Sequence, residues 1–155
     1  MNRKRAKTYS KPLGTGDASA VEFVQEMLQG DPTYGINFDR VQWDSEEERY
    51  VIVEFLLCEE RQFKRGVTPY SSHPNRYFNL NAQKFISLWK LAQELEAKLY
   101  LVNYSKSGTK YQDQVLLMEV LNVDKGRTLP VETRDTRFTR KEFSEWFRAL
   151  NSRGS

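Results

Sequence analysis

The sequence contains one cysteine and one histidine, and it has no long apolar run. The single cysteine, Cys58, excludes an internal disulfide framework and a cysteine-based zinc cluster. The single histidine, His73, argues against a histidine-based metal centre. No segment reaches the roughly 18 apolar residues that a membrane-spanning helix needs, and the first residues lack the apolar stretch of a signal peptide. We therefore expect a cytoplasmic protein.

The length and composition favour one globular domain. The chain has 155 residues, enough for a hydrophobic core but too few for two comfortable domains. Hydrophobic residues make up 39% of it and charged residues 29%, a balance that excludes wholesale disorder. We predict a flexible basic arm over residues 1–17, an α/β domain over 18–151 and a disordered tail over 152–155.

The net charge of +3 is unevenly distributed along the chain. The first twelve residues carry five basic side chains and no acid, whereas acids dominate between Glu22 and Glu60. Basic ends around an acidic centre are typical of a protein that holds a polyanion beside a cation site. The alternative is that the basic residues only form a solvated surface. The residues expected to contact nucleic acid are Arg3, Lys4, Arg5, Lys64, Arg65 and Arg76.

Hydrophobic periodicity predicts three helices and four strands around one long loop over residues 59–79. Asn81 is expected to cap the second helix, and Thr139 and Glu142 to form a capping box on the third. Gly126 and Pro130 mark a second loop. This order predicts the α/β class, a single domain with a central mixed β-sheet flanked by helices. The helices are expected over 19–29, 80–97 and 139–151, and the strands over 36–43, 49–58, 98–105 and 111–123.

Two carboxylates, Asp39 and Glu54, fall within neighbouring predicted strands that are otherwise rich in apolar residues. A carboxylate in such a strand is costly to bury unless another group compensates its charge. If the strands pair about the acidic turn between them, the two carboxylates lie side by side, and one must be protonated or a cation must be shared. Mg²⁺ binds few carboxylate oxygens when a phosphate supplies the other ligands, so the pair predicts a magnesium site.

Structural roles for the same two acids stay open at this point. Asp39 could cap a turn or form an ion pair with a neighbouring arginine, and Glu54 could form a buried salt bridge. The basic candidates for these pairs are Arg40 and Arg49 for Asp39, and Lys98 and Arg76 for Glu54.

The order of the elements resembles that of the PD-(D/E)XK nuclease superfamily, whose fold is called restriction-endonuclease-like. The resemblance covers roughly residues 18 to 123: a helix, a strand INFD, a strand IVEFL, a helix QKFISLWKLAQEL and a strand KLYLVNY. It implies that Asp39 is the family's first acidic metal ligand and that Glu54 is the acid of the triplet. Glu22 or Glu26 would match the acid that some members add on the first helix, although both also fit a solvated face. The implied metal is Mg²⁺, held by Asp39, Glu54 and Glu22.

The chain departs from the family at the lysine of the triplet, because Leu56 stands two residues after Glu54. In the family this lysine positions or activates the attacking water, and some members recruit a basic or amide side chain from another element. Lys84, near the start of the second long helix, is the best candidate for that role. Weaker candidates are Gln83, Lys64 and Gln62.

The resemblance implies a DNA-binding, magnesium-dependent endonuclease that hydrolyses phosphodiester bonds. Small members of the family often cut as dimers, so a homodimer is expected. Two alternatives follow from Leu56 and from the structural roles of the acids. The fold could be catalytically degenerate and serve as a non-enzymatic nucleic-acid or protein-binding module, or the acidic strands could belong to a structural adaptor for basic partners.

Overall fold

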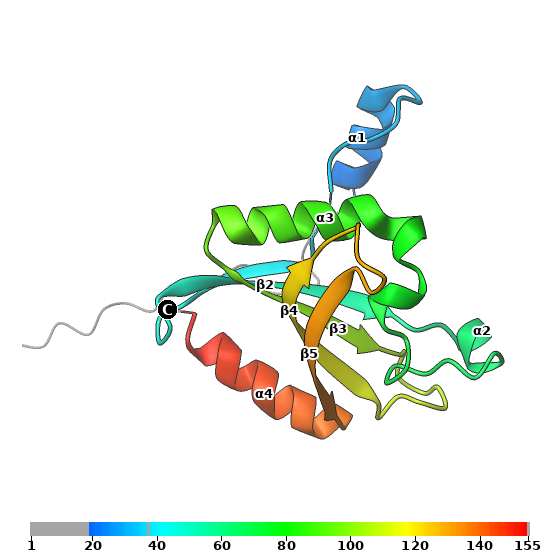
Figure 1. The fold of residues 1–155 in the computed structure, drawn as a ribbon, viewed down its shortest axis with the longest axis vertical. Coiled ribbons are helices and arrows are strands. Elements are labelled where there is room, and N and C mark those ends of the chain that lie inside the picture. Colours follow the sequence, from blue (N-terminus) through cyan, green and yellow to red (C-terminus); the bar gives the residue numbers. More distant parts are fainter. Residues whose placement is uncertain (1–18, 37, 155) are drawn as a thin grey trace, which may run out of the picture.

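The protein is built around a five-stranded mixed sheet. The structure, a computed structural model, describes residues 19–36 and 38–154. The predicted α/β class is confirmed (Figure 1). The basic arm with Arg3, Lys4 and Arg5 lies outside the described residues. The strands, in the order in which they pair, are β1 (Arg40–Asp44), β2 (Arg49–Leu57), β3 (Lys98–Tyr104), β4 (Val115–Val123) and β5 (Val131–Phe138).

The strands β2 and β3 are parallel, whereas all other neighbours in the sheet are antiparallel. Parallel neighbours need a long crossover connection. Here that connection holds the short helices α2 (Glu60–Phe63) and η1 (Pro74–Arg76) and the long helix α3 (Phe78–Glu94). The predicted long loop is therefore the first half of a crossover.

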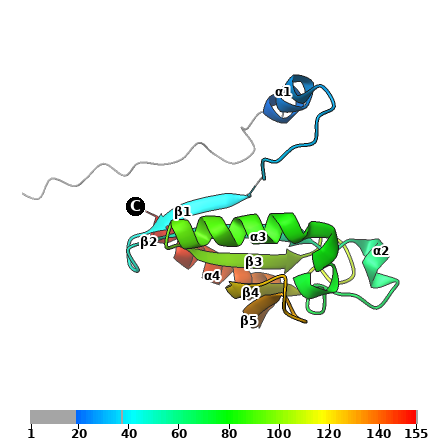
Figure 2. The same cartoon turned by 45° about the horizontal axis from the view of Figure 1, so that its top comes forward.

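The side chains of β2 alternate between two hydrophobic cores, as strand geometry requires. On one face Ile52 and Leu56 pack with the buried residues of α3. On the other face Val51 and Val53 pack against Leu150 of helix α4 (Arg140–Ser152). The two views agree that α3 and α4 lie on opposite sides of the sheet (Figures 1 and 2). Glu54 lies between Ile52 and Leu56 in sequence, so its side chain belongs to the α3 face.

Helix α1 (Ser19–Leu28) lies apart from the sheet, at the end of an extended segment (Figures 1 and 2). None of its residues is buried. Its apolar side chains stay exposed, Phe23 by 60% and Met27 by 54% of their surface. Within the described chain, no helix is long and apolar enough to cross a membrane.

The first strand and the second long helix begin at other residues than predicted, and one strand was not predicted. The first strand starts at Arg40, so Asp39 precedes it. Helix α3 starts at Phe78 and is interrupted at the expected cap Asn81, whose φ of −132° and ψ of 21° are not helical. The fifth strand, β5, was not predicted, because its sequence VETRDTRF is an exposed polar edge with only Val131 buried. The capping box of Thr139 and Glu142 on α4 is confirmed.

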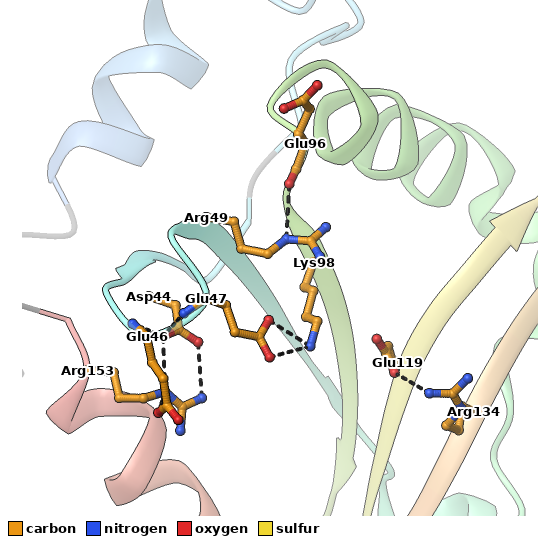
Figure 3. A network of polar contacts seen from close by, with 9 residues as sticks. All are labelled: Asp44, Glu46, Glu47, Arg49, Glu96, Lys98, Glu119, Arg134 and Arg153. Carbon is orange, nitrogen blue, oxygen red and sulfur yellow. Dashed lines mark hydrogen bonds and ion pairs between the residues drawn. The ribbon is translucent and has the colours of Figure 1, made fainter.

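Residues 152–154, within the segment expected to be a disordered tail over 152–155, are part of the described structure. Helix α4 runs through Ser152, and Arg153 reaches back to the first hairpin. Its Nε and Nη2 atoms donate to the two carboxylate oxygens of Asp44 at 3.1 Å each (Figure 3). Asp44 is buried, and its hydrogen bonds with Arg153 lower the pKa of its carboxyl group despite the burial.

Candidate functional site

The structure brings Asp39, the residue directly before β1, close to Glu54 of β2. Arg40 pairs with Val53 in the antiparallel register, so the preceding residue, Asp39, lies opposite Glu54. The backbone N–H of Asp39 donates to Glu54 Oε2 at 3.1 Å. In return, the backbone N–H of Phe55 donates to Asp39 Oδ2 at 2.8 Å. The two acidic residues therefore fix each other across the point where regular strand pairing ends.

Lys84 of α3 completes this arrangement. Its Nζ atom lies 2.6 Å from Glu54 Oε1. The Glu54 side chain is only 5% exposed, whereas that of Lys84 is 33% exposed and reaches solvent. We call Asp39, Glu54 and Lys84 the acid–lysine cluster. Gln83, the neighbouring candidate, instead donates to Ser87 Oγ on its own helix at 2.9 Å.

None of the four ion pairs considered from the sequence for Asp39 and Glu54 is found among the described residues. Lys98 pairs with Glu47 at 2.8 Å, and Arg49 donates to the backbone carbonyl of Glu96 at 3.1 Å (Figure 3). The structural role left for Glu54 is the ion pair with Lys84 itself. Arg40 and Arg76 likewise have no carboxylate partner within the described chain; Arg40 donates to Gln42 and Asn151.

The surroundings of Glu54 favour a bound proton or cation. Burial raises the pKa of the Glu54 carboxyl group, and the negative charge of Asp39 raises it further. The ammonium of Lys84 opposes both effects by hydrogen bonding and charge, but the pKa of Glu54 stays above its ordinary value. A carboxyl group with a raised pKa beside a lysine and an exposed aspartate is an arrangement typical of reactive sites.

The two carboxylates differ in how their oxygen atoms are engaged, since both oxygens of Glu54 have partners in Lys84 and in the backbone of Asp39. Asp39 is exposed, and its Oδ1 atom has no partner within residues 19–36 and 38–154. Mg²⁺ is commonly held by one or two carboxylates while substrate phosphates supply other ligands. Among the described residues no group of three or more Asp, Glu, His or Cys side chains could hold a metal. Glu22 on α1 is therefore not brought to Asp39 and Glu54.

The predicted nucleic-acid residues of the long connection lie on its surface. Lys64 follows α2, Arg65 is its neighbour, and both are exposed. Arg76 of η1 lines a hollow of about 490 Å³ together with Lys125 and Arg127. Lys125 and Arg127 were not among the residues predicted to contact nucleic acid, because they lie in a polar turn between β4 and β5, far from Arg76 in sequence.

A second missed feature is a groove of about 600 Å³ between the sheet and α4, with Asp39 in its wall. We call it the aromatic groove. Phe143 and Phe147 are four residues apart on α4, and this spacing is equally typical of residues in a hydrophobic core, so the sequence alone did not predict a groove. Its main lining residues are Phe55, Tyr104, Phe143, Phe147, Arg40 and Arg140.

His73 and Cys58 have structural surroundings. His73 Nε2 lies 2.8 Å from Thr133 Oγ1, and its Nδ1 accepts the backbone N–H of Asn75, so the imidazole ties the connection to β5. Burial lowers the pKa of His73. Cys58 is buried, and burial raises the pKa of its thiol, which makes it a poor nucleophile.

A comparison of the chain with protein-family models, curated proteins and solved structures finds no match. Any function must therefore be argued from the site itself.

Proposed function

We propose that the acid–lysine cluster is a magnesium-dependent site for phosphodiester hydrolysis, and that the protein is a DNA-binding endonuclease with a restriction-endonuclease-like fold. The observation that carries the proposal is the 2.6 Å contact between Lys84 Nζ and Glu54 Oε1. Leu56 occupies the family's lysine position, on the face of β2 that packs against α3. Lys84 comes from α3, so it supplies an ammonium on the face where the triplet lysine is missing.

Each residue of the acid–lysine cluster would have a separate role. Asp39 and Glu54 would hold Mg²⁺, which when bound stabilises charge on the phosphate and makes a water more acidic. Lys84, whose side chain is 33% exposed, keeps the Glu54 carboxylate in place through Oε1, and its ammonium would orient a water or contact a phosphate oxygen. Lys64, Arg65, Arg76, Lys125 and Arg127 would hold the DNA backbone as positive charges.

A second candidate function rests on the same contact. The ammonium of Lys84 already compensates Glu54, and partly buried ion pairs of this kind also occur where no catalysis takes place. The fold would then be a degenerate nuclease that binds nucleic acid without cutting it. In either case, a homodimer would give the exposed apolar side chains of α1 a surface to cover.

The test is cleavage of plasmid and oligonucleotide DNA by the full chain with Mg²⁺, with Mn²⁺ or with EDTA. We expect cutting that needs the metal and that is lost in Asp39→Asn and Glu54→Gln. Thermal melting confirms that each variant folds. If no cutting is seen with either metal, or if cutting is unchanged in both variants, the proposal that the protein is an endonuclease is wrong. Salt-sensitive DNA retention that survives both substitutions then supports the binding module.

A further inference from the structure

We infer that the aromatic groove binds one unpaired nucleobase of the strand whose phosphate lies at the acid–lysine cluster. This inference rests on the proposed function, because the cluster fixes the position of the phosphate. Asp39 links the two places: its carboxylate contacts the backbone of β2 beside Glu54, and it also lines the groove. The groove lies on the α4 face of the sheet, whereas Glu54 and Lys84 lie on the α3 face. A nucleotide with its phosphate at Asp39 would therefore reach the groove around the edge of the sheet at which Asp39 lies.

The walls of the groove contain four aromatic rings that contact one another. The Phe55 ring is the centre of the cluster, with edge-on contacts to Tyr104 at 6.3 Å and to Phe147 at 6.0 Å between ring centroids. Phe143 stacks on Phe147 at 5.7 Å with 18° between their planes. All four rings are neither fully buried nor fully exposed, because they border an open space. Base–aromatic stacking contributes about 1–3 kcal/mol per base and tolerates any base.

The charges of the groove suit the phosphates on either side of a base. The Arg40 guanidinium lies 4.9 Å from the centroid of the Phe147 ring. Arg140 donates to the backbone carbonyls of Ser105 and Gln112 at 2.7 and 2.9 Å. Neither arginine forms an ion pair within the described chain, and Asp39 is the acidic residue of the same lining. Two arginines in the lining of an aromatic groove favour an anionic strand with a planar group over an uncharged apolar ligand.

The size of the groove is sufficient for one nucleotide. A volume of about 600 Å³ lies within the roughly 300–1,000 Å³ of sites that enclose one small organic ligand, which is enough for a nucleotide. A base can enter only if it is unpaired, since a paired base is stacked inside the duplex. The geometry therefore points to DNA with an unpaired nucleotide next to the phosphate at the cluster, as in a single strand, a flap or a bulge.

The test uses oligonucleotides that carry 2-aminopurine, whose fluorescence falls when it stacks on an aromatic ring. The full chain is titrated in EDTA into a single strand, a duplex with one bulged 2-aminopurine, and a fully paired duplex at the same salt concentration. We expect at least fivefold tighter binding of the two unpaired probes, with quenching on binding. Phe147→Leu keeps apolar bulk but removes the ring, and it should abolish both effects. Tyr50→Leu is the control, because Tyr50 is 43% exposed on the first hairpin, outside the groove.

The outcomes separate this inference from the proposed function. Equal affinity for paired and unpaired probes, or quenching that is unchanged in Phe147→Leu, overturns the nucleobase site even if the protein cuts DNA. Competition by an acidic peptide but not by a single strand overturns it as well. Quenching that needs Phe147 supports it even if no metal-dependent cutting is found, and the protein is then a binding module for unpaired DNA.

Discussion

Lys84 on α3 and Glu54 on β2 are joined by a contact of 2.6 Å between Nζ and Oε1, although 30 positions separate them in the sequence. The contact crosses from the covering helix to the sheet, at the point where Asp39 pairs with the backbone of β2. Leu56, on the same face, packs into the core beneath α3. The ammonium at this point therefore comes from the helix and not from the strand.

The first prediction concerns the origin of that ammonium. Lys84→Met should lower the cleavage rate constant about 100-fold or more, because a positioned proton donor or acceptor contributes roughly 10²–10⁴ in rate. Adding Leu56→Lys to this variant should restore at least a tenth of the lost activity, since it returns a lysine to the face of Glu54. Single-turnover cleavage measures both effects. The control is Lys90→Met, an exposed lysine of the same helix. If the ion pair is purely structural, Lys84→Met should lower the melting temperature and leave the cleavage rate constant of the folded protein unchanged.

The sequence was sufficient to predict β2 and α3, because the hydrophobic pattern of each element lies within a short segment of the chain. The strand β2 is strongly apolar, and the periodicity of α3 places Phe85 and Leu88 in the core. Leu88 follows Lys84 by four residues, about one helical turn, so the helix that buries Leu88 brings Lys84 to the same face of the sheet. The acids meet because the turn between β1 and β2 sets an antiparallel register.

The sequence was insufficient where a feature depends on distant segments. The aromatic groove combines Phe55, Tyr104 and Phe147 from three elements. From the sequence alone, each of these aromatic residues would be expected in the hydrophobic core. The strand β5 stays in the sheet through pairing with β4, although its polar sequence shows little hydrophobic alternation. The ion pair of Arg153 with Asp44 joins the two ends of the domain and leaves no local pattern.

The raised pKa of Glu54 predicts how stability depends on pH. The unfolded chain binds fewer protons than the folded one between the ordinary pKa of a glutamate and the raised pKa of Glu54. The free energy of unfolding should therefore fall as the pH rises through this window, and the loss should be complete above the folded pKa. Glu54→Gln should remove this fall. Urea unfolding between pH 4.5 and 8 measures it, with the exposed Glu60→Gln as the control. A slope that persists unchanged in Glu54→Gln contradicts the assignment.

The hollow formed by Arg76, Lys125 and Arg127 predicts a specific effect on DNA binding. Each phosphate contact contributes close to one unit to the slope of log affinity against log salt concentration. Arg76→Gln and Arg127→Gln should each weaken binding and reduce that slope by about 1. The ion pair of Arg127 with Glu132 at 3.1 Å is exposed, so its loss should change stability little. Fluorescence anisotropy at several salt concentrations measures the slope, and Lys90→Gln is the control. An unchanged slope in both variants places the DNA elsewhere.

The last prediction concerns the link between Arg153 and Asp44. Arg153→Met leaves the buried Asp44 carboxylate without its strongest partner, which should cost about 1–3 kcal/mol of unfolding free energy at pH 7. Arg153 lowers the pKa of Asp44, so the stability from this pair is present above the ordinary pKa of an aspartate and is lost as the pH falls through the folded pKa. The difference between the wild type and Arg153→Met should therefore shrink in acid. Urea unfolding at pH 7 and pH 3 measures it, and Arg148→Met on the exposed side of α4 is the control. Equal stability of Arg153→Met and the wild type at pH 7 would show that the C-terminal residues do not hold the first hairpin.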